Sequence, residues 1–166
     1  ALIDITKSYN QPYYASAVGE VNVVAQMKSK QAVIGGEGNG GVIYPESHYG
    51  RDSIVGIGLF LSLFVERGLT ASKLLSTYPE YHMVKEKINL SPSLNVDSIL
   101  SQIAERYNNE NLDLVDGVRI DFTESWVQLR KSNTEPIIRI YSEAKTIDKA
   151  KDLIKEIETL VNQLTN

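Results

Sequence analysis

Apolar residues recur every three or four positions near the end of the chain. This spacing predicts a helix over about Ile147 to Leu164, because residues so spaced share one side of a helix. The apolar side would consist of Ile147, Ala150, Leu153, Ile154, Ile157, Leu160, Val161 and Leu164. A helix with one apolar side is stable only against another layer, so the preceding residues must supply that layer.

Segments rich in β-branched and aromatic residues precede this helix and can supply the layer. They predict strands over residues 83–90, 117–122, 126–130 and 137–143. A further helix is predicted over residues 96–108, with Ile99, Ile103 and Ala104 facing inward. Strands flanked by two helices predict a small α+β domain over residues 81–166, with both helices on one face of an antiparallel sheet.

The first part of the chain instead alternates helices and strands, as α/β layers do. Helices are predicted over residues 1–8, 19–30, 51–67 and 71–76, and strands over 13–18, 32–34 and 42–44. We therefore predict an α/β partial domain over residues 1–76 and a linker around Pro79. The apolar run from Ile54 to Val65 is shorter than the roughly 20 residues that span a bilayer, so we predict a buried helix.

The composition excludes several classes of function. The 166 residues include no cysteine, which excludes disulfides, thiolate metal sites and a cysteine nucleophile. The net charge is -4 with both signs interspersed, so no nucleic-acid partner is expected. The shortness of the longest apolar run means that no membrane is expected either. The start, ALIDITKSYN, lacks the features of a signal peptide and an initiator Met. Because it begins within a predicted helix, we expect a piece of a longer protein. The absence of cysteine fits a reducing compartment, so a cytoplasmic location is expected.

The glycine-rich stretch 35-GGEGNGG-41 follows a predicted strand and lets a ligand approach the backbone closely. It is no dinucleotide fingerprint, because a strand rather than a helix follows it, and it lacks the Gly-Lys-Ser/Thr of a P-loop. Its polar side chains, Glu37 and Asn39, suit the hydroxyl groups of a sugar. A flexible hairpin with exposed polar residues explains the stretch equally well.

The segment 130-RKSNTEPIIR-139 connects two predicted strands and offers donors that a phosphate dianion needs. These donors are a forked guanidinium, two hydroxyls and an amide, from Arg130, Ser132, Thr134 and Asn133. The alternative is an ordinary hairpin loop, whose small polar side chains satisfy the local backbone.

Other residues that often carry chemistry are expected to be structural. His48 and His82 have no second metal ligand at a suitable spacing, so no metal site is expected. Trp126 lies on a predicted strand, and we expect it in the core rather than as a platform for a sugar.

Together, the two loops resemble those of the α-D-phosphohexomutases, which include phosphoglucomutase/phosphomannomutase and phosphoglucosamine mutase. GGEGNGG is similar to the family's sugar-binding loop, usually Gly-Glu-x-Ser-Gly. RKSNTEPIIR is similar to its C-terminal phosphate-binding loop, usually Arg-x-Ser-x-Thr-Glu-Pro. The stretch 17-AVGEVNVVAQM-27 resembles the segment that precedes the sugar loop, so the resemblance extends over nearly all of the chain.

The resemblance implies where the chain lies in a four-domain enzyme. Residues 1–76 would end the third, α/β domain, and residues 81–166 would form the fourth, an α+β fold of TATA-binding-protein-like type. The family's phosphoserine loop and Asp-x-Asp-x-Asp metal loop are absent from the sequence. The chain would therefore hold no catalytic residue and no Mg2+ ligand, and would be inactive without the N-terminal domains of the same protein.

The resemblance also implies roles for individual residues. A phosphohexomutase interconverts hexose 1-phosphate and 6-phosphate through a bisphosphorylated sugar and a phosphoserine enzyme. Residues implied to bind the sugar are Glu37 and Asn39. Residues implied to bind the substrate phosphate are Arg130, Ser132, Asn133, Thr134 and Arg139.

Departures from the family pattern bear on the choice of hexose. Asn39 replaces the usual Ser, Gly41 stands where many members have His, and Glu20 stands where some have another polar residue. An asparagine in this loop is similar to archaeal-type and acetylglucosamine-type members, so we favour glucosamine phosphate over mannose or glucose phosphate. The alternatives are a stand-alone phosphosugar-binding module without catalysis and a last domain that serves protein contacts.

Overall fold

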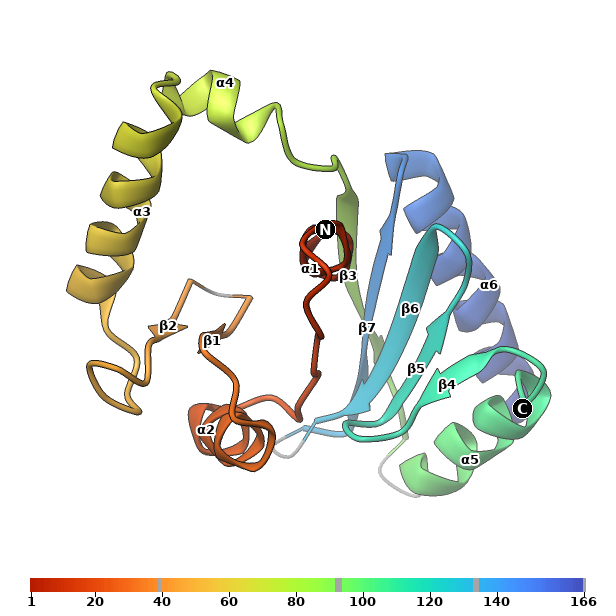
Figure 1. Cartoon of the computed structure of the whole chain (residues 1–166). Coiled ribbons are helices and arrows are strands. Elements are labelled where there is room, and N and C mark those ends of the chain that lie inside the picture. Colours follow the sequence, from red (N-terminus) through yellow and green to blue (C-terminus); the bar gives the residue numbers. More distant parts are fainter. Residues whose placement is uncertain (39, 92–93, 133–134, 166) are drawn as a thin grey trace. The chain divides into compact units, whose positions relative to one another are not determined.

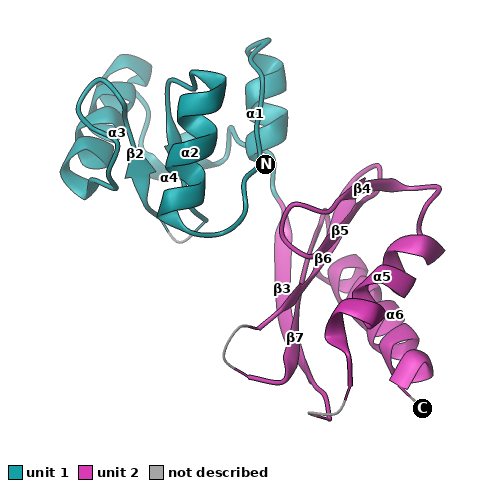
Figure 2. Ribbon diagram, turned by 90° about the horizontal axis from the view of Figure 1, so that it is seen from below, with its two compact units in different colours: residues 1–80 teal, residues 81–166 magenta. Residues whose placement is uncertain are grey.

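The computed structural model describes residues 1–38, 40–91, 94–132 and 135–165. The chain divides into two units, Ala1–Glu80 and Tyr81–Asn166, which Figure 2 shows in different colours. Each unit has its own cluster of buried apolar residues, so each can be described by itself.

Unit 2 is an antiparallel five-stranded sheet with both of its helices on one face (Figure 1). In the spatial order β3-β7-β6-β5-β4, the strands are β3 (His82–Asn89), β7 (Ile137–Ala144), β6 (Ser125–Lys131), β5 (Val118–Asp121) and β4 (Asn111–Asp113). Helix α6 (Ile147–Thr165) packs on β3, β7 and β6, and α5 (Val96–Arg106) packs on β5 and β6. The predicted α+β architecture is confirmed, although the sequence pattern does not predict β4.

Alternation along each strand separates the two faces of this sheet. On β6, Val127 and Leu129 are fully buried beneath the helices, whereas Gln128 and Arg130 alternate with them on the helix-free face. Helix α6 supplies the other side of the core, and its predicted apolar side is confirmed except at the exposed Ile147. Its buried members are Ala150, Leu153, Ile154, Ile157, Leu160 and Val161.

Trp126 is not a core residue, contrary to the expectation from sequence. It alternates with the buried Val127 and therefore lies on the helix-free face. Its Nε1 donates to Oε1 of Glu143 at 3.1 Å, and the guanidinium of Arg119 lies 4.3 Å from its ring centroid. An indole whose N–H is satisfied and whose ring is covered by a cation is stable at a half-buried position.

Unit 1 combines helices with a short hairpin. Its elements are α1 (Leu2–Ser8), α2 (Glu20–Lys30), β1 (Gly35–Gly36), β2 (Val42–Ile43), α3 (Ser53–Arg67) and α4 (Ala71–Leu75). Strands β1 and β2 pair antiparallel, with Gly35 opposite Ile43. Helix α2 packs on this hairpin through buried Val23 and Met27, and this contact positions the glycine-rich stretch.

The start of α3 is tied to the same hairpin. The N–H of Asp52 donates to the carbonyl of Val42 at 2.8 Å. Oδ1 of Asp52 accepts hydrogen bonds from the N–H groups of Ile54 and Val55, at 2.8 and 3.0 Å, which caps the helix. The bond from Val55, followed by the one from His48, lowers the pKa of the Asp52 carboxyl. Residues just before this cap therefore have a defined position beside the glycine-rich stretch.

Two predicted strands of unit 1 are wrong. Residues 13–18 pair with no strand in the described part of the chain. Residues 32–34 form no strand either, and β1 begins only after them, at Gly35. A run of β-branched or aromatic residues favours extended backbone, but a strand also needs a ladder partner. Within the described residues of unit 1, β2 is paired to β1 and no partner reaches the two predicted segments.

The run from Ile54 to Val65 forms a helix as predicted, but the expectation that this helix is buried is wrong. No residue of α3 is buried, and Ile54 and Val65 are 78% and 79% exposed. A helix that is apolar nearly all round needs layers on several sides, whereas α3 contacts only β2 and α4 to any extent within the described residues. Among the helices that the structure describes, none is long and apolar enough to cross a membrane.

Candidate functional site

The glycine-rich stretch forms the turn between β1 and β2. The N–H of Glu37 donates to the carbonyl of Gly41, and the N–H of Gly40 donates to the carbonyl of Glu37, both at 3.0 Å. A Cβ at Gly36 would lie 2.4 Å from the carbonyl oxygen of Gly41, so a larger residue would shift the backbone. This tight turn presents Glu37; Asn39, the other predicted sugar ligand, lies outside the described residues.

The carboxylate of Glu37 is held at both oxygens. Oε1 accepts a hydrogen bond from the N–H of Gly19 at 3.2 Å, and Oε2 accepts one from Nη1 of Arg51 at 3.1 Å. A carboxylate has about four lone-pair sites, so each oxygen keeps capacity for another donor. The side chain is 13% exposed, so part of it remains at the surface.

Glu20 holds Arg51 in turn. Nε of Arg51 donates to Oε2 of Glu20 at 3.0 Å, and the backbone N–H of Arg51 donates to Oε1 at 3.1 Å. The backbone bond and then the guanidinium bond lower the pKa of the Glu20 carboxyl. Reasoning from sequence assigns Arg51 no role, because its partners lie 31 and 14 residues away along the chain.

Two predicted phosphate ligands meet on the helix-free face of unit 2. Arg130 on β6 and Arg139 on β7 are directly opposite each other in the ladder. Nη1 of Arg130 lies 3.1 Å from Oδ2 of Asp116, and Nη2 of Arg139 lies 3.7 Å from Oε2 of Glu135. Like charges directly opposite each other destabilise a sheet, and these acids reduce that cost.

Lys87 extends this pair to a row of three cations. It lies on β3 directly opposite Arg139, so the row crosses three adjacent strands. No carboxylate of the described residues forms an ion pair with Lys87. Reasoning from sequence misses it, because only the order β3-β7-β6 places it beside the two arginines. We call Lys87, Arg139 and Arg130 the cation row.

Ser132 directly follows β6, two residues after Arg130 of the cation row. Its N–H donates to the carbonyl of Ile137 at 3.1 Å, and the residue is 8% exposed. It lines a cavity of about 280 Å³ together with Lys131, Glu135, Pro136 and the start of α5. Lys131 pairs with Asp97 of α5 at 2.7 Å, which ties this end of the hairpin to the helix. Asn133 and Thr134, predicted to bind phosphate, lie outside the described residues.

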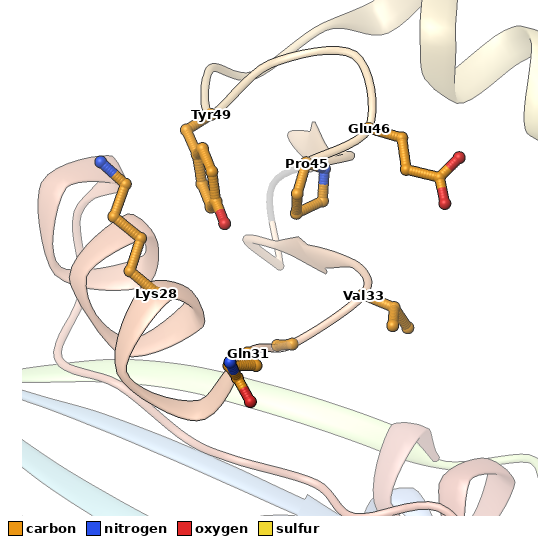
Figure 3. A pocket seen from close by; sticks show the side chains of 7 residues that line it. Lys28, Gln31, Val33, Pro45, Glu46 and Tyr49 are labelled. Atoms are coloured by element: carbon orange, nitrogen blue, oxygen red, sulfur yellow. The ribbon is translucent and has the colours of Figure 1, made fainter.

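A larger hollow in unit 1 is separate from the predicted site residues. It has a volume of about 550 Å³, and Lys28, Gln31, Val33, Pro45, Glu46 and Tyr49 line it (Figure 3). Nζ of Lys28 lies 4.8 Å from the ring centroid of Tyr49, so both groups already have a partner. Glu37 does not line this hollow.

The described residues do not fit a metal ion. Within the described ranges, no group of three or more His, Cys, Asp or Glu side chains gathers closely enough to ligate one. His48 instead lies 3.0 Å from Oδ2 of Asp52, beside the cap of α3.

Comparison with protein families explains why both sites occur in one chain. Residues 1–81 match the model of "Phosphoglucomutase/phosphomannomutase, alpha/beta/alpha domain III", and residues 86–160 match that of "Phosphoglucomutase/phosphomannomutase, C-terminal domain". The chain belongs to the phosphoglucomutase/phosphomannomutase family. The predicted resemblance to phosphohexomutases is thereby confirmed, as is the α/β domain followed by an α+β domain.

Curated relatives of the family are similar over nearly all of the chain. A phosphoglucosamine/phosphogalactosamine mutase of Sulfurisphaera tokodaii is 36% identical over 155 residues, which are 92% of this chain and 34% of the relative. A phosphoglucomutase/phosphomannomutase of Thermococcus kodakarensis is 34% identical over 156 residues, 93% of this chain and 34% of the relative. The chain thus spans about a third of the length of these relatives.

Solved structures show the same fold. A phosphoglucomutase/phosphomannomutase family protein of Burkholderia thailandensis superimposes with a TM-score of 0.78 at 20% identity, over 98% of this chain and 35% of that one. A putative phosphomannomutase of Thermus thermophilus superimposes with a TM-score of 0.68 at 24% identity, over 97% and 34%. At these identities the likeness concerns the fold alone.

Proposed function

We propose that the chain is the substrate-binding C-terminal portion of a phosphohexomutase that interconverts hexose 1-phosphate and hexose 6-phosphate. The reaction would pass through a bisphosphorylated sugar and a phosphoserine in domains outside this chain. The Mg2+ ligands would lie in those domains too. A cytoplasmic location, which suits a cysteine-free sequence, is part of the proposal.

The observation that carries this proposal is the opposite charge of the two sites. At the glycine-rich stretch, the guanidinium of Arg51 lies between the carboxylates of Glu20 and Glu37, which leaves one negative charge. Such a site repels a phosphate but accepts hydrogen bonds from hydroxyls. It is therefore suited to the ring of a sugar.

The cation row has the reverse balance. Its three cations face two acids, Asp116 and Glu135, which leaves one positive charge. A phosphate dianion accepts charge-assisted hydrogen bonds from such a group, and the forked guanidinium of Arg130 matches its geometry. This chain therefore has one site suited to the sugar ring and another suited to the phosphate of a sugar phosphate.

These sites fit what a mutase requires of its substrate-binding domains. One phosphate of the bisphosphorylated sugar must be held while the other reacts, and the two must then exchange places. The cation row and Ser132 would hold the non-reacting phosphate, with Asn133 and Thr134 adding donors. Glu37 and Asn39 would hold ring hydroxyls in either orientation. All of these residues act by positioning and electrostatics, and none forms or breaks a bond.

Steady-state kinetics of the full-length protein test the function. We expect turnover of hexose phosphates by the full-length protein and none by the isolated 166-residue chain, which lacks the proposed phosphoserine. Turnover by the isolated chain would refute the division into binding and catalytic domains. A full-length protein that binds hexose phosphates without converting them would instead favour a phosphosugar-binding module.

The same kinetics test the choice of hexose. We propose glucosamine phosphate on two grounds. Asn39 replaces the usual Ser of the sugar loop, which is similar to acetylglucosamine-type members of the family. A relative named as a phosphoglucosamine/phosphogalactosamine mutase is 36% identical. The kcat/KM of the full-length protein should then be highest for glucosamine phosphate. A higher value for mannose or glucose phosphate would overturn this choice.

Replacing Glu37 by glutamine in the full-length protein should weaken binding of a hexose phosphate about tenfold. The amide keeps one acceptor oxygen but loses the charge that strengthens each hydroxyl hydrogen bond. Binding of inorganic phosphate should be unchanged, because the cation row is intact. Isothermal titration calorimetry with both ligands provides the measurement, and equal loss for both would contradict a separate sugar site.

A further inference from the structure

We propose that Arg51 is a positioning residue for the sugar site, and that Glu20 and Gly41 are present because of it. The inference rests on the proposed function, since it concerns how Glu37 is held for a sugar. Arg51 lies just before α3, and two other segments of unit 1 meet it there: the start of α2 and the β1–β2 turn. The assembly of Glu20, Arg51 and Glu37 is called the carboxylate brace.

The geometry of the guanidinium makes Arg51 the centre of the brace. Its Nε donates to Glu20 and its Nη1 donates to Glu37, so two edges of one planar group are used. Glu20 also accepts the backbone N–H of Arg51, which holds the residue at both ends of its side chain. A lysine ammonium is a single point of charge and has no such planar fork. Arginine is therefore the side chain that transmits orientation from Glu20 to Glu37.

The absence of a side chain at Gly41 leaves room for the aliphatic part of the Arg51 side chain. A Cβ at this position would lie 2.5 Å from Cδ and 3.0 Å from Cγ of Arg51. Any side chain at residue 41 would thus displace the arginine stem, although it would leave every charged group of the brace in the sequence. This glycine accommodates Arg51, whereas Gly36 accommodates the backbone of the turn.

The brace is poorly placed to serve stability alone. The side chains of Arg51 and Glu20 are 45% and 37% exposed, and ion pairs with such exposure contribute little to the free energy of unfolding. The brace converges instead on Glu37, at 13% exposure the least exposed member. Loss of the brace should therefore impair sugar binding much more than folding.

The test uses the full-length protein and three substitutions, Arg51→Ala, Glu20→Gln and Gly41→Ala. We expect Arg51→Ala and Gly41→Ala each to raise the Kd for a hexose phosphate about tenfold or more, and Glu20→Gln to raise it less. The Kd for inorganic phosphate and the melting temperature should be nearly unchanged. Arg67→Ala is the matched control, because it removes an exposed arginine from the other end of α3 and should leave both Kd values unchanged.

Two further measurements separate positioning from a merely structural role. Added guanidinium ion should partly restore hexose phosphate binding to Arg51→Ala, but not to Gly41→Ala, where the native guanidinium is still present. Arg51→Ala should also add little to the defect of Glu37→Gln, because residues that act as one unit are not additive. If Gly41→Ala does not fold, the guanidinium rescue and the double variant still decide the question.

The outcomes distinguish this inference from the proposed function. If the wild-type protein binds and converts hexose phosphates while Arg51→Ala behaves like Arg67→Ala, the positioning role is wrong and the proposed function stands. An equal loss of sugar phosphate and inorganic phosphate binding would also overturn the positioning role. If the wild-type protein neither binds nor converts any hexose phosphate, the proposed function fails, and the positioning role fails with it.

Discussion

Replacing Arg130 by alanine in the full-length protein is expected to weaken binding of the phosphorylated hexose by about 1.5–3 kcal/mol, roughly 10- to 150-fold. The substitution removes the forked donor of the cation row together with its charge, whereas the negative charge of Asp116 remains beside the phosphate site. Both consequences disfavour a dianion. Titration calorimetry with glucosamine 6-phosphate, at constant ionic strength because exposed charges are screened by salt, gives the affinity.

Arg119→Ala is the matched control for this experiment. Arg119 lies on the same face of the sheet and is also paired with an acid, Asp121, at 2.7 Å. It belongs to β5, away from the loop between β6 and β7, and its guanidinium covers Trp126. Its replacement should leave the affinity unchanged. Equal losses for Arg119→Ala and Arg130→Ala, or no loss for Arg130→Ala, would remove the phosphate-binding role of the cation row.

Replacing Ile140 by alanine is expected to lower the free energy of unfolding of unit 2 by about 2–5 kcal/mol. Ile140 is fully buried on β7, which lies between β3 and β6, and it is opposite the buried Leu129. Deletion of its side chain leaves a cavity that neighbours on both strands and α6 cannot fill. Urea denaturation of the isolated chain, followed by the fluorescence of its single tryptophan, Trp126, reports on this unit.

Ile57→Ala provides the comparison, since the same side chain is removed from a surface position. Ile57 lies on α3 and is 57% exposed, so its loss removes little buried area. The urea midpoint of the Trp126 signal should not change, because Ile57 belongs to unit 1. A loss below about 1 kcal/mol for Ile140→Ala would mean that the core of unit 2 is not packed as described.

Prediction from sequence succeeded where the pattern was long and had a partner nearby. The apolar positions of α6 are spaced at helical intervals over its whole length, and β6 and β7 are consecutive strands that pair with each other. It failed at residues 13–18 and 32–34, where a strand-like composition meets no ladder partner in the described structure. It also failed for the burial of α3. An apolar sequence shows that a helix favours burial, but it does not show whether another element packs against that helix.

For the candidate sites, the sequence identified central residues but few of their partners. Glu37, Arg130 and Arg139 were recognised because motif loops carry them. Arg51 and Lys87 were not, since each approaches its site from another segment of the chain, and Glu20 was noted only as a departure from the family pattern and not as a partner of Arg51. Short stretches of sequence reveal which groups a loop offers, but contacts between distant segments appear only after folding.

By itself, the sequence determined the family, the order of the elements in unit 2 apart from β4, and the loops that offer a carboxylate and a guanidinium. These properties are local, because periodicity and motif both lie within a continuous run of residues. Only the tertiary structure decided the charge at each site. Strand order placed Lys87 beside Arg139 and Arg130, and the packing of α2, the hairpin and α3 placed Arg51 between two carboxylates. Coulombic interaction depends on distance in space, so residues far apart in the chain set the preference of each loop for its ligand.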